Sequence, residues 1–402
     1  MKILLIHNYY RSDAPSGEDN VARAEEKLIR DKGGSVVTFN KFNDEFDSYS
    51  LWQKIYASKE LIWSSKSYRQ IKSLLKTEKP DIAHFHNIFY LISPSAYYAC
   101  QEEKVPVVQT LHNFRFFCAN GLLLRNGKIC EDCIGRIPWR SIFFGCYRDS
   151  KLYSLPVSLM EIVHHYFKTW NKMVDIYIAL SEFSKRKFIE AGLPEEKIFV
   201  KPNFLLNSPQ PLFENGRYIV FIGRLSPEKG VLTLIKGIKI LQERSKRFNL
   251  SLKIIGDGPQ KEELMTKVRR YGIQKIEFLG RKRREECMEL LKNSSFVVIP
   301  SICYENFPMT IVESFACSKP VVASKIGSIP EIIEDGKTGF LFEPGNALDF
   351  AEKVEWMFEN EDACIKMGRN SRAEFERKYT AESNYALLME IYRKAIKEKR
   401  NA

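Results

Sequence analysis

RYIVFIGRLSPEKGVLTLIKGIKILQER, residues 217–244, joins an apolar run, a tight turn and a helical pattern in immediate succession. The run at 217–224 is almost continuously apolar, which is typical of a strand buried on both faces of a parallel sheet. The residues after the turn place apolar side chains three and four positions apart, as one face of a helix requires. The stretch therefore predicts a strand–turn–helix unit of a parallel α/β sheet.

The same unit recurs along the chain. Strands are expected at 2–10, 35–40, 81–87, 105–113, 174–181 and 197–203, and then at 217–224, 250–258, 275–280, 295–301 and 320–324. Between the two series, residues 204–216 are rich in Pro and Asn and are interpreted as a linker. Two such series predict two Rossmann-like, doubly wound domains, 1–203 and 217–380, with ligands bound in the cleft at the carboxyl ends of the strands.

Composition limits the partners. The 402 residues are 44% hydrophobic and 28% charged, with 62 Lys and Arg against 50 Asp and Glu, a net charge of +12. Such a balance favours phosphates, nucleic acid or acidic lipid. The charge is spread over both halves without a nucleic-acid-binding fingerprint, so we expect no nucleic acid partner. No apolar run is long enough to span a membrane, the N-terminal run is interpreted as a strand rather than a signal peptide, and the nine cysteines suggest a reducing cytoplasm.

Two cations lie where the second series begins. In IGRLSPEKG (222–230), Gly223 lets the backbone approach a ligand, and Arg224 and Lys229 stand near a helix start. Fixed positive charge beside unpaired helix N–H groups suits a diphosphate. A plain turn with two solvated cations is the alternative. The glycine-rich IIGDGP (254–259), which contains Gly256, is a weaker signal of the same kind.

Two carboxylates follow in CYENFPMTIVES (303–314). Glu305 and Glu313 are eight residues apart, nearly on one face of a helix, and Glu305 is expected at the helix entrance. A carboxylate placed there can accept both hydroxyls of a ribose, and backbone N–H groups between Asn306 and Met309 can meet a phosphate or sugar oxygen. Two helix-terminal acids on a solvated face are the alternative.

GRLSPEKG, GDGP and ENFPMTIVE, in this order, resemble the donor half of GT-B glycosyltransferases of the retaining family 4, whose E-x7-E motif the last segment matches. The family usually has Gly where this chain has Asn306. The resemblance implies that Arg224 and Lys229 hold the donor diphosphate, that Glu313 binds the ribose and that Glu305 contacts the donor sugar. It implies no catalytic metal, because the cations and the helix dipole take its role. The donor-binding residues implied are Ser16, Gly17, Gly223, Arg224, Lys229, Gly256, Arg281, Glu305, Asn306, Phe307, Pro308, Met309 and Glu313.

The first half supplies the acceptor side under this resemblance. PSGEDN (15–20) resembles the glycine-rich loop that approaches the donor phosphate, although a simple connection has the same composition. His112, at a strand end, would contact the donor sugar and complete a catalytic set with Arg224, Lys229 and Glu305. His86 and Arg115 would line the acceptor side with it. His84 and His86 alternate along one strand, where buried hydrogen-bonded histidines are favoured over a metal pair.

Residues 114–150 interrupt the β/α rhythm and contain Cys118, Cys130, Cys133 and Cys146. The C-x11-C-x2-C-x12-C spacing favours a structural zinc ion over disulfides or reduced thiols. The insert resembles that of a subset of family 4 enzymes, which implies an acceptor role. Residues 151–172 follow as a strongly apolar segment. An ordinary core helix is favoured there, and docking on a membrane surface is the alternative.

The resemblance implies retaining transfer of a sugar from a nucleotide-sugar to a glycan or a polyprenyl-diphosphate-linked acceptor. The expected setting is surface polysaccharide synthesis in the cytoplasm, at the inner membrane face. A C-terminal helix at 381–402 is expected to cross back to the first domain. The alternatives are a nucleotide-sugar epimerase of GT-B fold and an inactive zinc-stabilised protein that binds polyanions.

Overall fold

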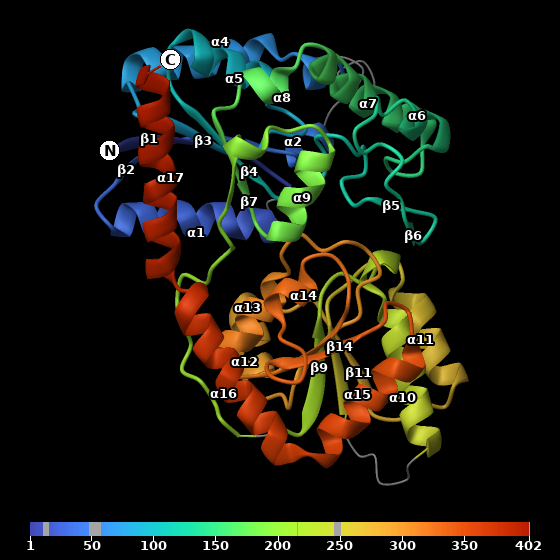
Figure 1. The fold of residues 1–402 in the computed structure, drawn as a ribbon. Helices are drawn as coiled ribbons and strands as arrows, with labels where there is room; N and C mark the ends of the chain where they lie inside the picture. The colour runs from blue at the N-terminus through green and yellow to red at the C-terminus, as the bar shows by residue number, and fades with distance from the viewer. Residues whose placement is uncertain (11–15, 48–57, 215, 245–250, 402) are drawn as a thin grey trace. The chain divides into compact units, whose positions relative to one another are not determined.

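The computed structural model describes residues 1–10, 16–47, 58–214, 216–244 and 251–401. The chain forms two compact units (Figure 1). Unit 1 comprises Met1–Leu123, Glu131–Leu206 and Ala381–Ala402, and unit 2 comprises Leu124–Cys130 and Asn207–Thr380. Each unit contains one six-stranded parallel sheet, so the doubly wound, two-domain α/β fold predicted from the sequence is confirmed.

The sheet of unit 1 has the strand order β2-β1-β3-β4-β7-β8. Its strands are β1 (Lys2–Tyr9), β2 (Ser35–Phe42), β3 (Ile82–Asn87), β4 (Val107–Leu111), β7 (Ile176–Ala179) and β8 (Ile198–Val200). The helices of the unit are α1 (Gly17–Asp31), α2 (Asp44–Asp47), α4 (Ser65–Glu78), α5 (Ser95–Glu102), α6 (Arg140–Phe144), α7 (Lys151–Tyr166), α8 (Thr169–Lys172), α9 (Glu182–Glu190), η1 (Glu195–Lys197) and α17 (Ala381–Asn401). Central strands β3 and β4 are buried on both faces, which explains their apolar sequences.

The sheet of unit 2 has the order β11-β10-β9-β12-β13-β14. Its strands are β9 (Tyr218–Ile222), β10 (Ser251–Ile255), β11 (Ile276–Gly280), β12 (Val297–Ile299), β13 (Val321–Ser324) and β14 (Gly339–Phe342). Its helices are η2 (Pro227–Lys229), α10 (Val231–Arg244), α11 (Lys261–Arg270), α12 (Arg284–Lys292), α13 (Met309–Ala316), α14 (Ile329–Ile332), α15 (Ala347–Glu359) and α16 (Glu361–Lys378). A short antiparallel hairpin joins β5 (Leu124–Arg125) to β6 (Lys128–Ile129). In both orders the first strand of the unit is internal, so the order reverses beside β1 and β9, where such sheets bind ligands.

Helix α17 packs on the first sheet, as the sequence predicts for the C-terminal helix. Leu388 and Tyr392 are fully buried in a core cluster that includes Leu5 of β1 and Val108 of β4. The expected linker begins later than residue 204, because Phe204 is itself buried beside Leu28 and Ala381. Burial of apolar side chains of this size contributes about 2 kcal/mol each, so α17 is an integral part of unit 1.

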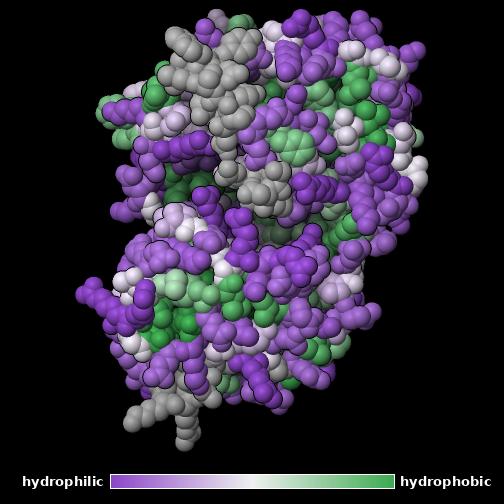
Figure 2. Space-filling view, turned by 180° about the vertical axis from the view of Figure 1, so that it is seen from behind, coloured by the Kyte–Doolittle hydropathy of each residue, from purple (hydrophilic) through white to green (hydrophobic). Residues whose placement is uncertain are grey.

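Hydrophobic side chains also reach the surface. Figure 2 shows them in several separate groups among hydrophilic residues on the face seen from behind. Among the described helices, none combines the length and the apolar composition that a bilayer crossing would need.

Candidate active site

Backbone hydrogen bonds join the carboxyl ends of β9, β10 and β11 in unit 2. The Gly223 N–H donates to the Ile255 carbonyl at 3.0 Å, and the Gly256 N–H donates to the Gly280 carbonyl at 2.8 Å. Gly256 has φ +142°, and a Cβ at this position would lie 1.9 Å from the Gly223 oxygen. Only glycine fits so close an approach. The structure therefore brings Gly223 and Gly256 together beside the strand end that precedes the exposed Arg281.

Lys229 and Glu305 form an ion pair that the sequence did not predict. Lys229 Nζ lies 2.6 Å from Glu305 Oε1, and Ser301 Oγ donates to the same oxygen at 2.6 Å. The Lys229 side chain is 32% exposed and that of Glu305 13%, so the pair is only partly screened by water. The contact joins η2, at the end of β9, to the loop between β12 and α13. Two of the predicted donor-binding residues are thus joined in one ion pair.

The pair keeps both groups ionised. Burial alone would lower the pKa of the Lys229 ammonium, but the Glu305 carboxylate outweighs burial and raises that pKa above its ordinary value. Burial likewise raises the pKa of Glu305, and the Lys229 charge outweighs it, so the Glu305 pKa lies below its ordinary value. Lys229 is therefore a cation at neutral pH, but Glu305 offsets its charge, so the net positive charge that an anionic ligand requires at this turn comes from the exposed Arg224.

Glu313 lies apart from this pair. Helix α13 begins only at Met309, so Glu305 is in the preceding loop and not at the helix entrance that the sequence predicted. Glu313 faces Arg284 of α12, with 3.6 Å between its Oε1 and the guanidinium. Burial raises its pKa, and Arg284 opposes that shift. Arg224 is exposed on the turn after β9, with its side chain accessible to a ligand.

Asn306, beside Glu305, has a side-chain amide that makes no hydrogen bond to the described residues. The residue is 9% exposed, and neither its amide nitrogen nor its amide oxygen has a hydrogen-bond partner among the described residues. An unsatisfied buried amide costs about 1–3 kcal/mol. A ligand that pairs with both amide atoms would recover this cost.

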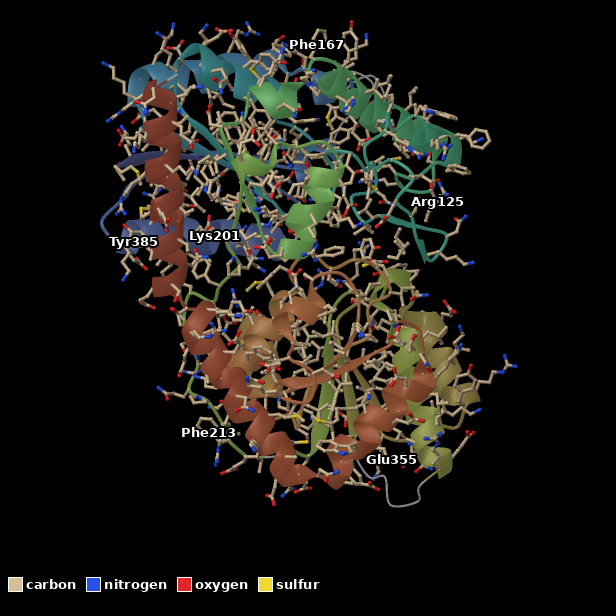
Figure 3. All side chains as sticks on the ribbon, in the orientation of Figure 1. Arg125, Phe167, Lys201, Phe213, Glu355 and Tyr385 are labelled. Atoms are coloured by element: carbon tan, nitrogen blue, oxygen red, sulfur yellow. The ribbon has the colours of Figure 1, made fainter. Side chains whose placement is uncertain are left out.

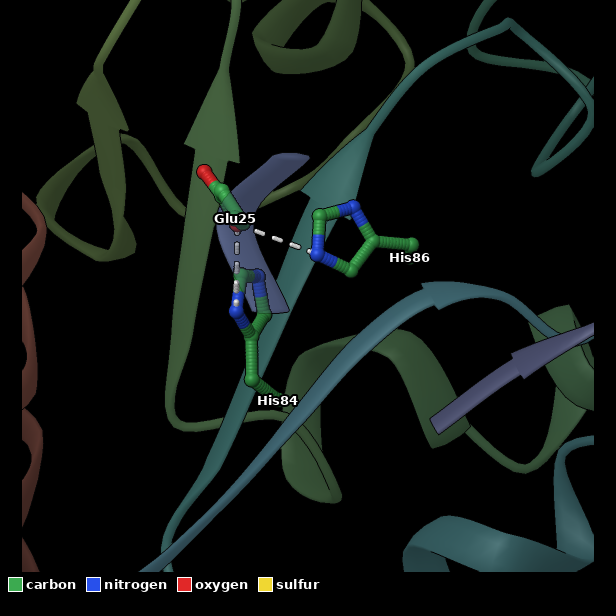
Figure 4. A group of neighbouring side chains, drawn as sticks. All are labelled: Glu25, His84 and His86. Carbon is green, nitrogen blue, oxygen red and sulfur yellow. Dashed lines mark ion pairs between the residues drawn. The ribbon is translucent and has the colours of Figure 1, made fainter. Parts of the chain in front are cut away.

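Unit 1 holds a buried polar cluster at the carboxyl ends of β3 and β4. His86 Nδ1 lies 2.9 Å from Nε2 of His112, and Glu25 of α1 contacts both His84 and His86 (Figure 4). Lys201, which follows β8, donates to Glu25 Oε1 at 2.5 Å and lies inside the unit (Figure 3). His84 is held by Tyr392 of α17 and by Thr110. The buried, hydrogen-bonded histidines favoured by the sequence are therefore what the structure shows.

A pocket of about 490 Å³, which includes space open to solvent, adjoins this cluster. All three predicted acceptor-side residues, His86, His112 and Arg115, are among those that line it. Arg115 lies over the Phe89 ring, with its guanidinium carbon 4.0 Å from the ring centre. An arginine and a histidine beside aromatic surface can bind the hydroxyls and apolar face of a sugar.

Ser16 and Gly17 begin α1. Ser16 Oγ accepts a hydrogen bond from the Asp19 N–H at 3.2 Å, and the Asp19 carboxylate accepts from the Ser16 N–H at 2.7 Å. This capping box gives Ser16 a structural role. A Cβ on Gly17 would meet no atom of the described residues within 4 Å. Pro15 of the same motif lies outside the described residues.

Comparison with known proteins supplies the family. Residues 206–374 match the family model described as glycosyl transferases group 1, and residues 48–205 match the model of glycosyltransferase family 4. The chain belongs to the family 4 glycosyltransferases. It is 29% identical to an uncharacterised glycosyltransferase of Methanocaldococcus jannaschii, over 83% of this chain and 88% of the relative. It is 24% identical to the N-acetyl-alpha-D-glucosaminyl L-malate synthase of Bacillus anthracis, over 88% of this chain and 84% of that enzyme.

The fold agrees with this family. The structure of Anabaena HepE in complex with UDP-glucose covers the whole of both chains with a TM-score of 0.65 and 20% identity. This likeness confirms the GT-B fold of the present glycosyltransferase.

The cysteines of this glycosyltransferase are not gathered into a metal site. Among the described residues, Glu25, His84 and His86 form the one group of three or more His, Cys, Asp or Glu ligand atoms within 4.8 Å of one another. Cys118 donates from Sγ to Asn120 at 3.1 Å, and burial raises the pKa of its thiol to about 12. Zinc binding by Cys118, Cys130, Cys133 and Cys146 therefore stays a prediction.

Sequence reasoning missed Glu25 and Lys201. Glu25 falls on the apolar face of α1, with Val21, Leu28 and Ile29, and a charge on such a face was the signal available. Lys201 directly follows an apolar strand, but nothing in the sequence pairs it with a residue 176 positions away.

Proposed function

We propose that this family 4 glycosyltransferase moves a sugar, with retention of anomeric configuration, from a nucleotide-sugar to a glycan or a lipid-linked oligosaccharide acceptor in surface polysaccharide synthesis. The observation that carries the proposal is the Lys229–Glu305 pair, with 2.6 Å between the ammonium and the carboxylate. It holds the Lys229 ammonium in place at the strand ends where α/β sheets bind phosphates, and the exposed Arg224 adds a second cation there. The complex of Anabaena HepE with UDP-glucose supports a nucleotide-sugar as donor.

In the proposed reaction, Lys229 and the exposed Arg224 bind the donor diphosphate. The bond between the anomeric carbon and the phosphate oxygen breaks, the new bond forms to an acceptor hydroxyl oxygen, and the hydroxyl proton passes to the released diphosphate. Negative charge grows on the leaving nucleoside diphosphate, and prearranged cations stabilise that charge most in the transition state. Glu313 receives the ribose hydroxyls, and the unsatisfied Asn306 amide pairs with a polar group of the donor. Because these cations neutralise the leaving group, we expect transfer to persist in the presence of a chelator.

The test begins with ligand binding. A thermal-shift panel of nucleotide-sugars that includes UDP-glucose should show at least one that raises Tm, because a ligand at one hundred times its Kd stabilises the native state by about 2.7 kcal/mol. Transfer with the best donor is then measured in Lys229→Ala, with Lys236→Ala on the exposed side of α10 as the matched control. We expect Lys229→Ala to lose about a hundredfold or more in kcat and Lys236→Ala to match the wild type. Equal activity of both variants would refute the assigned role of Lys229.

We also propose that α6 and α7 dock this enzyme on an acidic membrane surface. Helix α7 presents Ser154, Ser158 and Glu161 to the interior and leaves Leu152 76% exposed and Tyr166 80% exposed. Val157 and Met160 are buried as well, so α7 packs on unit 1 through one face and exposes apolar residues on the other, whereas the core helix favoured from the sequence would bury most of them. The exposed Phe167 that follows α7 is labelled in Figure 3.

Basic side chains lie among these apolar residues. The Lys151 ammonium is 5.2 Å from the ring centre of Phe143, which is 62% exposed, and Arg148 lies over Tyr153. Lys168, beyond the end of α7, is also exposed. Apolar side chains interleaved with cations are the composition of surfaces that bind anionic lipid.

Vesicle sedimentation tests the docking surface. The wild type should sediment with vesicles that contain phosphatidylglycerol, and less at high salt, because salt screens the attraction. The double variant Leu152→Ser, Tyr166→Ser should bind at least tenfold more weakly. Leu348→Ser, at a position of unit 2 that is 45% exposed, should bind as the wild type does. Undiminished binding of the double variant, or concentration-dependent dimers in place of vesicle binding, would contradict a lipid surface here.

A further inference from the structure

Glu25 lies at the centre of the buried cluster of unit 1. Its side chain and those of His84, His86 and Lys201 are all 0% exposed. Lys201 donates to one carboxylate oxygen of Glu25 at 2.5 Å, and the other oxygen lies 3.1 Å from Nε2 of His86 (Figure 4). The ammonium already neutralises the carboxylate, so the group is a hydrogen-bond network and not a metal site.

Hydrogen bonds in this network can run in one direction only. Burial raises the pKa of Glu25, but the Lys201 charge outweighs burial and holds that pKa well below its usual range, so the carboxylate only accepts. Among the described residues, neither Nε2 of His86 nor Oε2 of Glu25 makes a hydrogen bond, so the 3.1 Å between them is an ion-pair distance and not a hydrogen bond. The negative charge of Glu25 still favours the His86 proton on Nε2, the nitrogen that lies beside the carboxylate.

The same reasoning continues to His112. Burial lowers the pKa of His86 and of His112, so both rings are neutral and each carries one proton. With its proton on Nε2, His86 has a bare Nδ1, and this atom lies 2.9 Å from Nε2 of His112. His112 must then donate from Nε2, which leaves its own Nδ1 as an acceptor. Both histidines line the pocket beside Arg115.

We propose that Glu25 is a positioning residue that fixes the tautomer of His112, so that His112 Nδ1 accepts a hydrogen bond from a hydroxyl of the sugar substrate. The assignment of a sugar rests on the proposed function. The assignment of the His112 tautomer does not rest on the proposed function, because it follows from contacts within unit 1. Glu25 acts through His86 and touches no substrate.

The substitution Glu25→Gln should reverse the chain of donors. Lys201 requires an oxygen on its side, so the new amide nitrogen must face His86 and donate to it. His86 would then carry its proton on Nδ1 and donate to Nε2 of His112, which would move the His112 proton to Nδ1. Asp175→Asn is the matched control, because Asp175 is a partly buried acid of unit 1 that pairs with Lys399 outside this network.

Nitrogen NMR of 15N-histidine-labelled protein reads the tautomers directly, since the chain has only six histidines and a His112→Asn sample identifies the His112 signals. We expect the Nε2–H form of His112 in the wild type and in Asp175→Asn, and the Nδ1–H form in Glu25→Gln. A wild-type His112 protonated on Nδ1, or an unchanged tautomer in Glu25→Gln, would overturn the proposal. If Glu25→Gln does not fold, the His112 tautomer in the wild-type spectrum tests the proposal by itself.

Kinetics supply the second readout. In Glu25→Gln, kcat for sugar transfer should fall at least tenfold while the nucleotide-sugar that raises the wild-type Tm still binds, because the change acts on one ring and not on the diphosphate site. A kcat equal to that of Asp175→Asn would overturn the link to catalysis. If no nucleotide-sugar binds the wild type, the proposed function is wrong. The NMR experiment still tests the tautomer of His112, because it needs no donor.

Discussion

Glu25, His84 and His86 bring ionisable groups into the interior of unit 1, and each group keeps the protonation state that its surroundings favour. Burial lowers the pKa of His84 well below its ordinary value, because a cation there would lose its hydration. Glu25 stays ionised only because Lys201 reaches it. Removal of that cation, as in Lys201→Met, would leave an unpaired buried charge, a change that typically costs about 3–5 kcal/mol.

We predict that unit 1 loses stability in mild acid. His84, His86 and His112 have lowered pKa values in the native state, so below about pH 6.5 the unfolded chain binds protons that the native protein does not. The free energy of unfolding should therefore fall as pH drops through this range, by about 1.4 kcal/mol per histidine and pH unit at most. Glu25, whose pKa is lowered too, adds a further loss below about pH 4.3. Urea midpoints at pH 7.5 and 5.5 measure the effect.

An exposed histidine provides the control for this prediction. His165 lies on the outer side of α7, so His165→Gln should retain the full pH dependence of the wild type. Equal urea midpoints at the two pH values would show that the buried histidines do not titrate as their environment requires.

Sequence reasoning at the residue scale succeeded where a residue type and its place on a strand were enough. His86 and His112 could be placed at adjoining strand ends because parallel strands end at one edge of a sheet. The contact of Lys229 with Glu305 could not be foreseen, since it depends on how the loop before α13 folds back toward η2. The start of α13 at Met309 corrects the expected position of Glu305 for the same reason.

Among the elements, α17 shows how a helix distant in sequence completes a domain. Leu388 is fully buried against the first sheet, whereas the adjacent Leu387 is 37% exposed. We predict that Leu388→Ala lowers the free energy of unfolding by about 2–5 kcal/mol, since it leaves a cavity in the core. Leu387→Ala should cost less than about 1 kcal/mol. Denaturant titration followed by tryptophan fluorescence compares the two, and equal losses would contradict the packing of α17.

Helix α7 shows the limit of sequence patterns at the element scale. An apolar composition indicates a buried helix when nothing else is known. In the structure its serines and His164 find hydrogen-bond partners inside, such as Ser141 and the Ile62 carbonyl, so polar residues share the buried side with Val157 and Met160. These partners come from distant segments, and no local pattern reveals them.

At the scale of the whole molecule, the two units have separate hydrophobic cores. We predict two transitions in calorimetry. The nucleotide-sugar that raises Tm should move the transition of unit 2, because ligand binding stabilises the part that binds. Leu388→Ala should move only the other transition. A single transition that shifts in both experiments would contradict independent cores.

The fold class and the family were within reach of the sequence, because repeated strand–helix patterns and the motifs around Arg224 and Glu305 are local. Donor, acceptor and the charge network around Glu25 depend on contacts between residues far apart in the chain, and local patterns do not encode them. Zinc binding by the four cysteines depends on such contacts too, and it stays a prediction.

His84 meets its hydrogen-bond partner Tyr392 across 308 residues of chain. At a synthesis rate of about 5–20 residues per second, the ribosome needs roughly 15–60 s to add that partner after His84 has been made. Throughout this interval the nascent first sheet lacks α17, one of the helices that cover it. The apolar side chains that α17 covers therefore stay exposed until that helix has been made, and such surface is prone to aggregation.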